Sequence, residues 1–271
     1  MSVLNDLPRW PVDNVAGAII GPGGVVVSAV GDTSRVYELA SVTKLLVAQA
    51  VLVAVDEEAV DLSTPAGLPG ATVRHLLSHA SGMAFDSREP QAGPGEQRIY
   101  SSAGFEALAE LVTAHTDIAF EDYLGEAVCE PLGMTSTVLA GPAGHGARSN
   151  VDDLARFAGD LLAPRVLTPA TAAAATTVQF PGLDGFVPGY GRHRPCDWGL
   201  GFEIRGEKTP HWTGTANSPQ TFGHFGQAGT FLWVDPVLGA ACVVLTDRPF
   251  GAWAKPLWSE FNDAVVNELR R

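Results

Sequence analysis

Residues 45–55 form a stretch in which Gln49 is the only polar side chain. A helix that is apolar on every side has to be buried inside a domain, so this stretch predicts a central helix. Ser41 and Lys44 stand directly before it, in the order Ser-Val-Thr-Lys. Residues three apart on a helix share a face, with Cβ atoms about 5–6 Å apart. Because burial lowers the pKa of a lysine ammonium, the pair has the layout of a serine nucleophile with a neighbouring base.

The same spacing has a structural alternative, in which Ser41 caps the helix and the stem of Lys44 lies along an apolar surface. The chain uses fourteen arginines and only three lysines, which indicates that position 44 needs a lysine in particular. The pair therefore favours hydrolase chemistry, but four residues with two fixed positions do not establish it.

Composition narrows the possible partners and the compartment. The net charge of −13 argues against a nucleic acid or an anionic membrane as partner, since both need a basic face. The longest apolar run is shorter than the roughly 20 residues of a membrane span, and the first ten residues lack the regions of a signal peptide. Three widely spaced cysteines match no metal pattern and fit a reducing compartment. We expect a cytoplasmic protein without a nucleic-acid or membrane partner, and no cofactor is indicated.

His75 and His79 are spaced four apart, as in some zinc sites on helices. They lack the adjacent glutamate of the usual motif and an obvious third ligand, so the sequence favours a structural or capping role and predicts no metal site.

The order of predicted elements indicates an α/β (α+β) protein with an antiparallel sheet flanked by helices. Residues 15–30 read as two strands around a tight turn, and helical periodicity follows at 41–55, 72–79, 102–116, 119–130, 151–163 and 168–177. Residues 178–195 read as a long surface loop, and strands are expected at 198–205, 221–225, 229–234 and 240–246 before a last helix at 253–270. We predict an α/β domain built from both termini (1–65 and 178–271) and an inserted, mostly helical domain (66–177).

Two further segments carry chemistry. Tyr100 precedes a helix that Ser101 or Ser102 would cap, and His224 lies at a strand edge, followed by Phe225, Gly226 and Gln227. Gly-x-Ser-x-Gly does not occur, which excludes the nucleophile elbow of the α/β-hydrolases.

With these three motifs in this order, the chain resembles the serine β-lactamase and penicillin-binding protein superfamily, in particular its class C-like branch of β-lactamases, D-amino-acid peptidases and esterases. The resemblance implies a β-lactamase/transpeptidase-like fold. It extends over nearly the whole chain, through the segments 75–83, 131–134, 153–157, 198–202 and 245–248.

The resemblance implies a role for each matching residue. Ser41 would be the acylated nucleophile, Lys44 would take or relay its proton, and Tyr100 would be the general base, with its pKa lowered by neighbouring cations. The backbone N–H groups of Ser41 and Gln227 would form the oxyanion hole. Ser102, His224 and Gly226 would complete the substrate-binding side.

Two departures from the branch pattern bear on the substrate. Ser102 stands where its β-lactamases have asparagine, and His224 stands where they have lysine; neutral histidine is a poorer partner for a substrate carboxylate. Lys208-Thr209 looks like the missing lysine motif, but Pro210 takes the place of its glycine, so His224 is the better choice. Trp198, Phe202, Trp212 and Phe225 are expected to line the pocket.

The sequence therefore predicts a serine hydrolase that forms an acyl-enzyme with a small-molecule ester or amide, most simply a β-lactamase-like carboxylesterase. A β-lactamase or D-amino-acid peptidase remains the enzymatic alternative, and a catalytically silent binding module of the same fold is the alternative from another class. The oligomeric state is left open.

Overall fold

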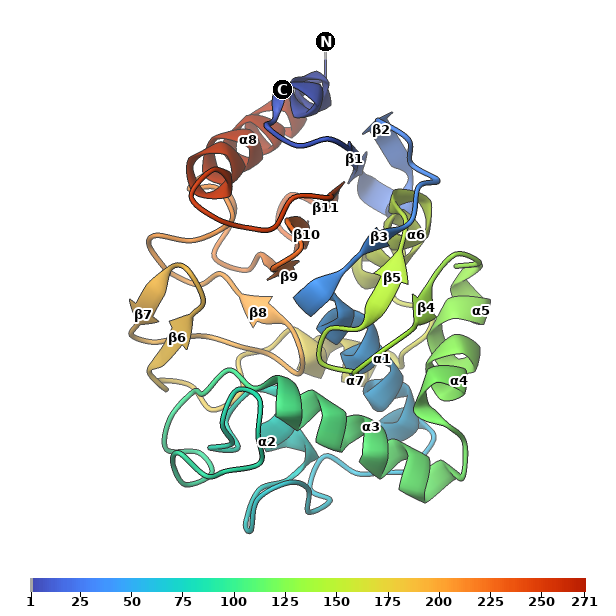
Figure 1. Ribbon diagram of the computed structural model, residues 1–271, viewed down its shortest axis with the longest axis vertical. Coiled ribbons are helices and arrows are strands. Elements are labelled where there is room, and N and C mark those ends of the chain that lie inside the picture. The colour runs from blue at the N-terminus through green and yellow to red at the C-terminus, as the bar shows by residue number, and fades with distance from the viewer. Residues whose placement is uncertain (1) are drawn as a thin grey trace.

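The computed structural model describes residues 2–271 and places a six-stranded antiparallel sheet between two layers of helices (Figure 1). The strand order is β2-β1-β11-β10-β9-β8. The strands are β1 (Val15–Ile20), β2 (Val26–Val30), β8 (Glu203–Ile204), β9 (Phe222–Gly226), β10 (Thr230–Asp235) and β11 (Ala240–Thr246). Because β1 pairs with β11 from Val15↔Thr246 to Ile20↔Ala241, the two ends of the chain build one sheet, as the sequence predicts.

Alternate residues of the central strands face two separate apolar layers. Ala18 and Val243 belong to the core shared with α1 (Thr43–Asp56) and α6 (Val151–Leu162). Ile19 and Val244 belong to the core shared with the N-terminal 3₁₀ helix η1 (Val3–Arg9) and α8 (Ala254–Leu269). Every residue of β11 is buried, since both faces of this strand are covered. Figure 1 shows η1 and α8 together at one end of the molecule.

The central helix is α1, and it is buried along nearly its whole length. Its one polar residue in the apolar stretch, Gln49, donates through Nε2 to Asp160 Oδ2 of α6 at 3.3 Å. The segment before β8 crosses α1 closely: a Cβ at Gly201 would lie 2.1 Å from Ala48 Cβ, and Gly201 has φ +91°. The strand predicted at 198–205 is confined to residues 203–204, and Trp198 pairs back with Glu203 across the turn that contains Gly201.

The helices of the middle third agree closely with the periodicity. They are α2 (Val73–Leu77), α3 (Ser102–Thr116), α4 (Phe120–Leu124), a π-helical turn η4 (Gly125–Cys129), α5 (Glu130–Leu132) and α7 (Pro169–Ala175). A small sheet joins β3 (Tyr37–Glu38), β5 (Ala147–Ser149) and β4 (Val138–Leu139). Helix α6 packs against β1, β10 and β11, although its residues lie in the segment assigned to the helical domain; the division at 65/66 and 177/178 stays a prediction.

The surface loop expected at 178–195 contains a hairpin, which corrects that prediction. Its strands are β6 (Gly185–Val187) and β7 (Gly191–His193). Three residues a strand are too few to show alternation, and the Gly and Pro content of the segment hid them. No helix within residues 2–271 combines the length and apolar character that a bilayer crossing requires.

Asn262 of α8 connects the last helix to the sheet. It is fully buried, its Oδ1 accepts from Trp233 Nε1 at 2.8 Å, and its Nδ2 donates to the carbonyl of Trp212 at 3.2 Å. An Asn262→Leu variant leaves both partners without a hydrogen bond in an apolar layer. We expect its free energy of unfolding in urea to fall by about 2 kcal/mol.

The exposed Asn267 of the same helix provides the control, because Asn267→Leu removes no buried hydrogen bond. Equal urea midpoints for the two variants would contradict this role of Asn262.

Candidate active site

Ser41 lies in the 3₁₀ turn η3 (Ala40–Val42) at the start of α1, and it is partly exposed. The strands hold this turn, since Thr230 Oγ1 donates to the carbonyl of Leu39 at 2.9 Å. A Cβ at Gly226 would lie 2.2 Å from the same carbonyl. Glycine at 226 therefore lets β9 run against the turn, and this places Gln227 on the wall of the cavity that Ser41 also lines.

Lys44 is fully buried behind Ser41. Its Nζ donates to Ser102 Oγ at 3.0 Å and to the carbonyl of Gly144 at 2.7 Å; within residues 2–271 it has no hydrogen bond to Ser41. Burial lowers the pKa of Lys44 to about 7, against a smaller opposing effect of Glu106. A large fraction of the amine is therefore neutral near pH 7 and able to accept a proton.

The hydroxyl of Tyr100 lies 3.2 Å from His224 Nε2. His224 Nδ1 lies 2.6 Å from the carbonyl of Phe225, and a carbonyl only accepts, so Nδ1 carries the ring proton. Nε2 then accepts, and the Tyr100 O–H donates to it. The phenol oxygen keeps its lone pairs for another donor, such as the hydroxyl of Ser41.

The prediction that neighbouring cations lower the pKa of Tyr100 is wrong. Burial raises this pKa, and the hydroxyl of Ser41 opposes the rise only in part. His224, one of the cations expected beside Tyr100, carries no charge at neutral pH. Burial, and then the charge of Lys44, lower its pKa to about 4. At neutral pH Tyr100 therefore keeps its proton.

Ser41, Tyr100, His224 and Gln227 line one cavity of about 140 Å³. Its apolar wall consists of Phe85, Val187, Pro188, Trp198 and Phe225. Trp198 and Phe225 are thus where the sequence predicts them, whereas Phe202 and Trp212 are fully buried core residues. Ser102 and Gly226 are not among the ten residues of segment 2–271 that line the cavity. Ser102 contacts Lys44 instead, so a direct contact with substrate stays a prediction.

Glu203 also lines the cavity, although the sequence motifs did not predict it. Its carboxylate is held by Lys208 Nζ at 3.3 Å, His211 Nε2 at 3.2 Å and Trp212 Nε1 at 2.8 Å. Burial alone would raise the pKa of Glu203, but Lys208 and His211 outweigh burial and hold it well below its usual range. Lys208, whose segment Lys208-Thr209 looks like the missing lysine motif, is therefore buried in this ion pair. A lone acidic residue in the apolar stretch 198–204 was the available signal.

His79, one of the two histidines considered for zinc, accepts hydrogen bonds from the residues on both sides of Tyr100. Its carbonyl accepts from the backbone N–H of Ile99 at 2.9 Å, and its Nδ1 accepts from that of Ser101 at 3.1 Å. The left-handed φ of +56° at His79 turns both acceptors toward the segment that carries Tyr100. His75 contacts Thr72 at 2.9 Å. Residues 2–271 contain no cluster of three or more His, Cys, Asp or Glu side chains that could hold a metal ion.

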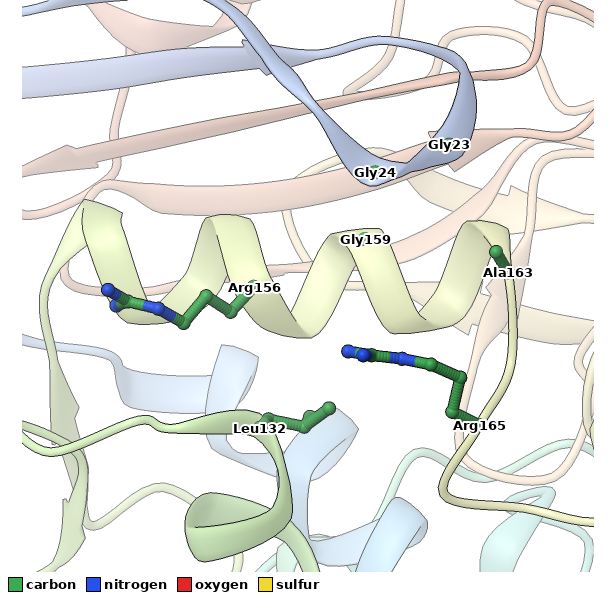
Figure 2. A pocket seen from close by; sticks show the side chains of 7 residues that line it. All are labelled: Gly23, Gly24, Leu132, Arg156, Gly159, Ala163 and Arg165. Atoms are coloured by element: carbon green, nitrogen blue, oxygen red, sulfur yellow. The ribbon is translucent and has the colours of Figure 1, made fainter.

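A larger hollow of about 400 Å³ lies over α6, where Gly23, Gly24 and Gly159 meet. Figure 2 shows that the side chains of Arg156 and Arg165 extend along this helix and do not converge on one point. Arg156 pairs with Asp153 at 3.1 Å. The lining contains no nucleophile and no titratable group besides these arginines, so the cavity at Ser41 is the candidate active site.

Comparisons with known proteins identify the family and the fold. The family model described as Beta-lactamase matches residues 12–265. The crystal structure of a beta-lactamase from Mycobacterium bovis is 57% identical, with a TM-score of 0.98 and 99% of each chain covered. An octameric penicillin-binding protein homologue from Pyrococcus abyssi has the same fold, with a TM-score of 0.75, 19% identity, and 98% of this chain and 75% of that chain covered.

A curated relative from Escherichia coli O157:H7, named "Putative D-alanyl-D-alanine carboxypeptidase", is 25% identical over 214 residues. The match covers 60% of this chain and 48% of the relative, so the chain spans about half the length of the curated relatives it matches.

The pKa values of the site predict how acylation depends on pH. Between about pH 6 and 8 only Lys44 titrates among the three groups at Ser41, since the pKa of His224 is about 4 and that of Tyr100 is raised. The neutral amine accepts a proton and the ammonium cannot. We expect the rate at which a fluorophosphonate labels Ser41 to rise with pH, with a midpoint near 7.

Lys44→Met should label slowly and without this rise, whereas Lys255→Met, at an exposed lysine of α8, should keep the wild-type profile. A flat profile for the wild-type protein would remove Lys44 from the proton transfer.

Proposed function

The chain belongs to the beta-lactamase family of hydrolases, and we propose that within this family it is a carboxylesterase. It would cleave small neutral esters through an acyl-enzyme on Ser41. The observation that carries this proposal is that the ten lining residues provide no free cation: His224 is neutral because its pKa is about 4, and the one carboxylate on the wall, Glu203, is already paired with Lys208. A penicillin and the C-terminus of a peptide both bring a carboxylate, for which this cavity offers no fixed cation.

The apolar wall supports a small acyl group. A cavity of about 140 Å³ lies well below the roughly 300–1,000 Å³ of drug-sized sites. Phe225 and Trp198 are nearly fully buried, so the cavity has little room to widen without disturbing the core. Short aliphatic acyl chains match both its volume and its lining.

We assign the general base to Lys44, whose pKa lies nearest to neutrality. Ser41 Oγ attacks the ester carbonyl and forms a C–O bond while its proton passes to the amine of Lys44. The ammonium is then stabilised by Ser102, by the carbonyl of Gly144 and by the ring of Tyr100, whose centroid lies 4.6 Å from Nζ.

Collapse of the tetrahedral intermediate breaks the bond to the alcohol oxygen, which takes the proton back. Water then attacks the carbonyl of the acyl-enzyme and gives a proton to Lys44. The bond to Ser41 Oγ breaks, this oxygen takes the proton back, and the carboxylic acid is released. Tyr100, with its proton held by His224, orients the hydroxyl of Ser41, and the backbone N–H groups of Ser41 and Gln227 stabilise the oxyanion.

A β-lactamase is the second candidate, because the 57% identical structure from Mycobacterium bovis carries that description. A binding module that keeps the fold without turnover is the third. It is disfavoured by the combination of a partly exposed Ser41 and a Lys44 whose pKa is about 7, which binding alone does not require.

A paired assay distinguishes these candidates. We expect the protein to hydrolyse short-chain p-nitrophenyl esters and to leave nitrocefin intact, since nitrocefin carries a carboxylate. Ser41→Ala should lower ester turnover by more than about 10³-fold. Nitrocefin turnover without ester turnover would favour the β-lactamase, and absence of both, with no fluorophosphonate labelling, would favour the binding module.

The two supporting residues are tested by Lys44→Met and Tyr100→Phe, which keep most of the side-chain volume. Each should lower kcat for the ester by at least about 10²-fold, the usual contribution of acid–base assistance. Thermal unfolding of both variants controls for loss of fold. A folded variant with a nearly normal rate would remove its residue from the mechanism.

A further inference from the structure

A second hollow, of about 540 Å³, adjoins the catalytic cavity. The two share Phe85, Tyr100 and Pro188 on their walls. The outer hollow is bounded by the loop before Tyr100 on one side and by strand β6 with Phe186 on the other. Tyr100 therefore stands between an inner space that contains Ser41 and an outer space that does not.

Both exposed phenylalanines of residues 2–271 lie at this outer hollow. Phe85 is 52% exposed and Phe186 is 59% exposed, although phenylalanine is among the residues most often buried. Two exposed aromatic rings on one concave surface indicate a place where an apolar group binds.

The position of Phe85 is fixed. Its ring stacks over the ring of Tyr100, with centroids 5.9 Å apart and planes inclined by 23°. Its carbonyl accepts from the backbone N–H of Ser102 at 2.7 Å and of Ala103 at 3.2 Å, and so satisfies the first turn of α3. The ring is thus held beside the catalytic tyrosine before any ligand arrives.

Arg98 fixes the opposite wall. Its backbone N–H donates to the carbonyl of Asp184 at 2.9 Å, next to β6. Its buried guanidinium donates to the carbonyls of Ser78 at 2.6 Å, Gln179 at 2.8 Å and Cys196 at 2.9 Å. The charge of Arg98 is therefore engaged inside the protein and does not face the hollow.

The remaining polar groups of the outer hollow are neutral. They are the amides of Gln91 and Gln97, both on the exposed side. The hollow consequently offers aromatic surface and amide hydrogen bonds, and no free charge for an anionic or cationic ligand.

The arrangement around Tyr100 gives the direction of the substrate. Ser41, His224 and Gln227 line the inner cavity and are not on the wall of the outer hollow. The scissile carbonyl has to meet Ser41, so one part of the ester lies in the inner space and the other extends past Tyr100; the inner volume of about 140 Å³ fits a small acyl group. We propose that the outer hollow binds the alcohol part, and that the substrates are small-acyl esters of bulky, neutral aromatic alcohols. This inference rests on the esterase function proposed above.

Benzyl acetate and methyl acetate test the inference, because their acyl groups are identical and their alcohols are similarly acidic. We expect kcat/KM of the wild-type protein to be at least about tenfold higher for the benzyl ester, as burial of an aromatic ring predicts. Phe186→Ser should bring the benzyl-to-methyl ratio close to one. Val237→Ser, at a valine that is 66% exposed and lies outside both cavities, should keep the wild-type ratio.

The ratio is internal to each variant, so partial unfolding does not imitate the effect. A wild-type ratio near one, with both esters hydrolysed, overturns the aromatic subsite and leaves the esterase function intact. An unchanged ratio in Phe186→Ser also overturns the subsite. If neither ester is hydrolysed and Ser41 is not labelled by a fluorophosphonate, the proposed function fails and the inference fails with it.

Discussion

The site depends on the burial of one amine. Lys44 sits at the start of a helix that the core encloses, and taking its ammonium out of water lowers its pKa to about 7. The hydrogen bonds and protonation states around the amine depend on the same burial. The carbonyl of Gly144 and the hydroxyl of Ser102 accept hydrogen bonds from it, and the raised pKa of Tyr100 and the neutral state of His224 arise from the same low-dielectric surroundings.

The same surroundings determine which charges the cavity presents. Glu203 remains ionised only because Lys208, His211 and Trp212 supply three donors to its two oxygens. His224 has no comparable ion pair, and it is uncharged at neutral pH. The cavity therefore combines a neutral imidazole with a carboxylate that is already paired with Lys208.

Much of the fold follows from local pattern, because burial and periodicity act along the sequence. The apolar stretch 45–55 predicted α1, and alternation predicted β9, β10 and β11 within one or two residues. The pairing of serine, tyrosine and histidine motifs identified residues that do share one cavity. Local pattern could not predict the outer hollow, since Phe85 and Phe186 are about a hundred residues apart and only the tertiary fold brings both to the hollow beside Tyr100. Glu203 left one local signal, its charge within an apolar stretch, but its place on the cavity wall also depends on the tertiary fold. The pKa of Tyr100 was mispredicted because it depends on the charge state of its neighbours, which burial changes.

Strand β1 pairs with β11 along its full length, and this has a consequence for biosynthesis. During translation the N-terminal strand and the apolar helix α1 leave the ribosome long before their partners near residues 240–246 exist. Contacts of such long sequence separation form slowly, and the nascent chain meanwhile exposes an aggregation-prone apolar helix. Gly226 and Gln227, which complete the surroundings of Ser41, also arrive late. A chain that ends before β9 therefore carries Ser41 without the cavity that His224, Phe225 and Gln227 help to line.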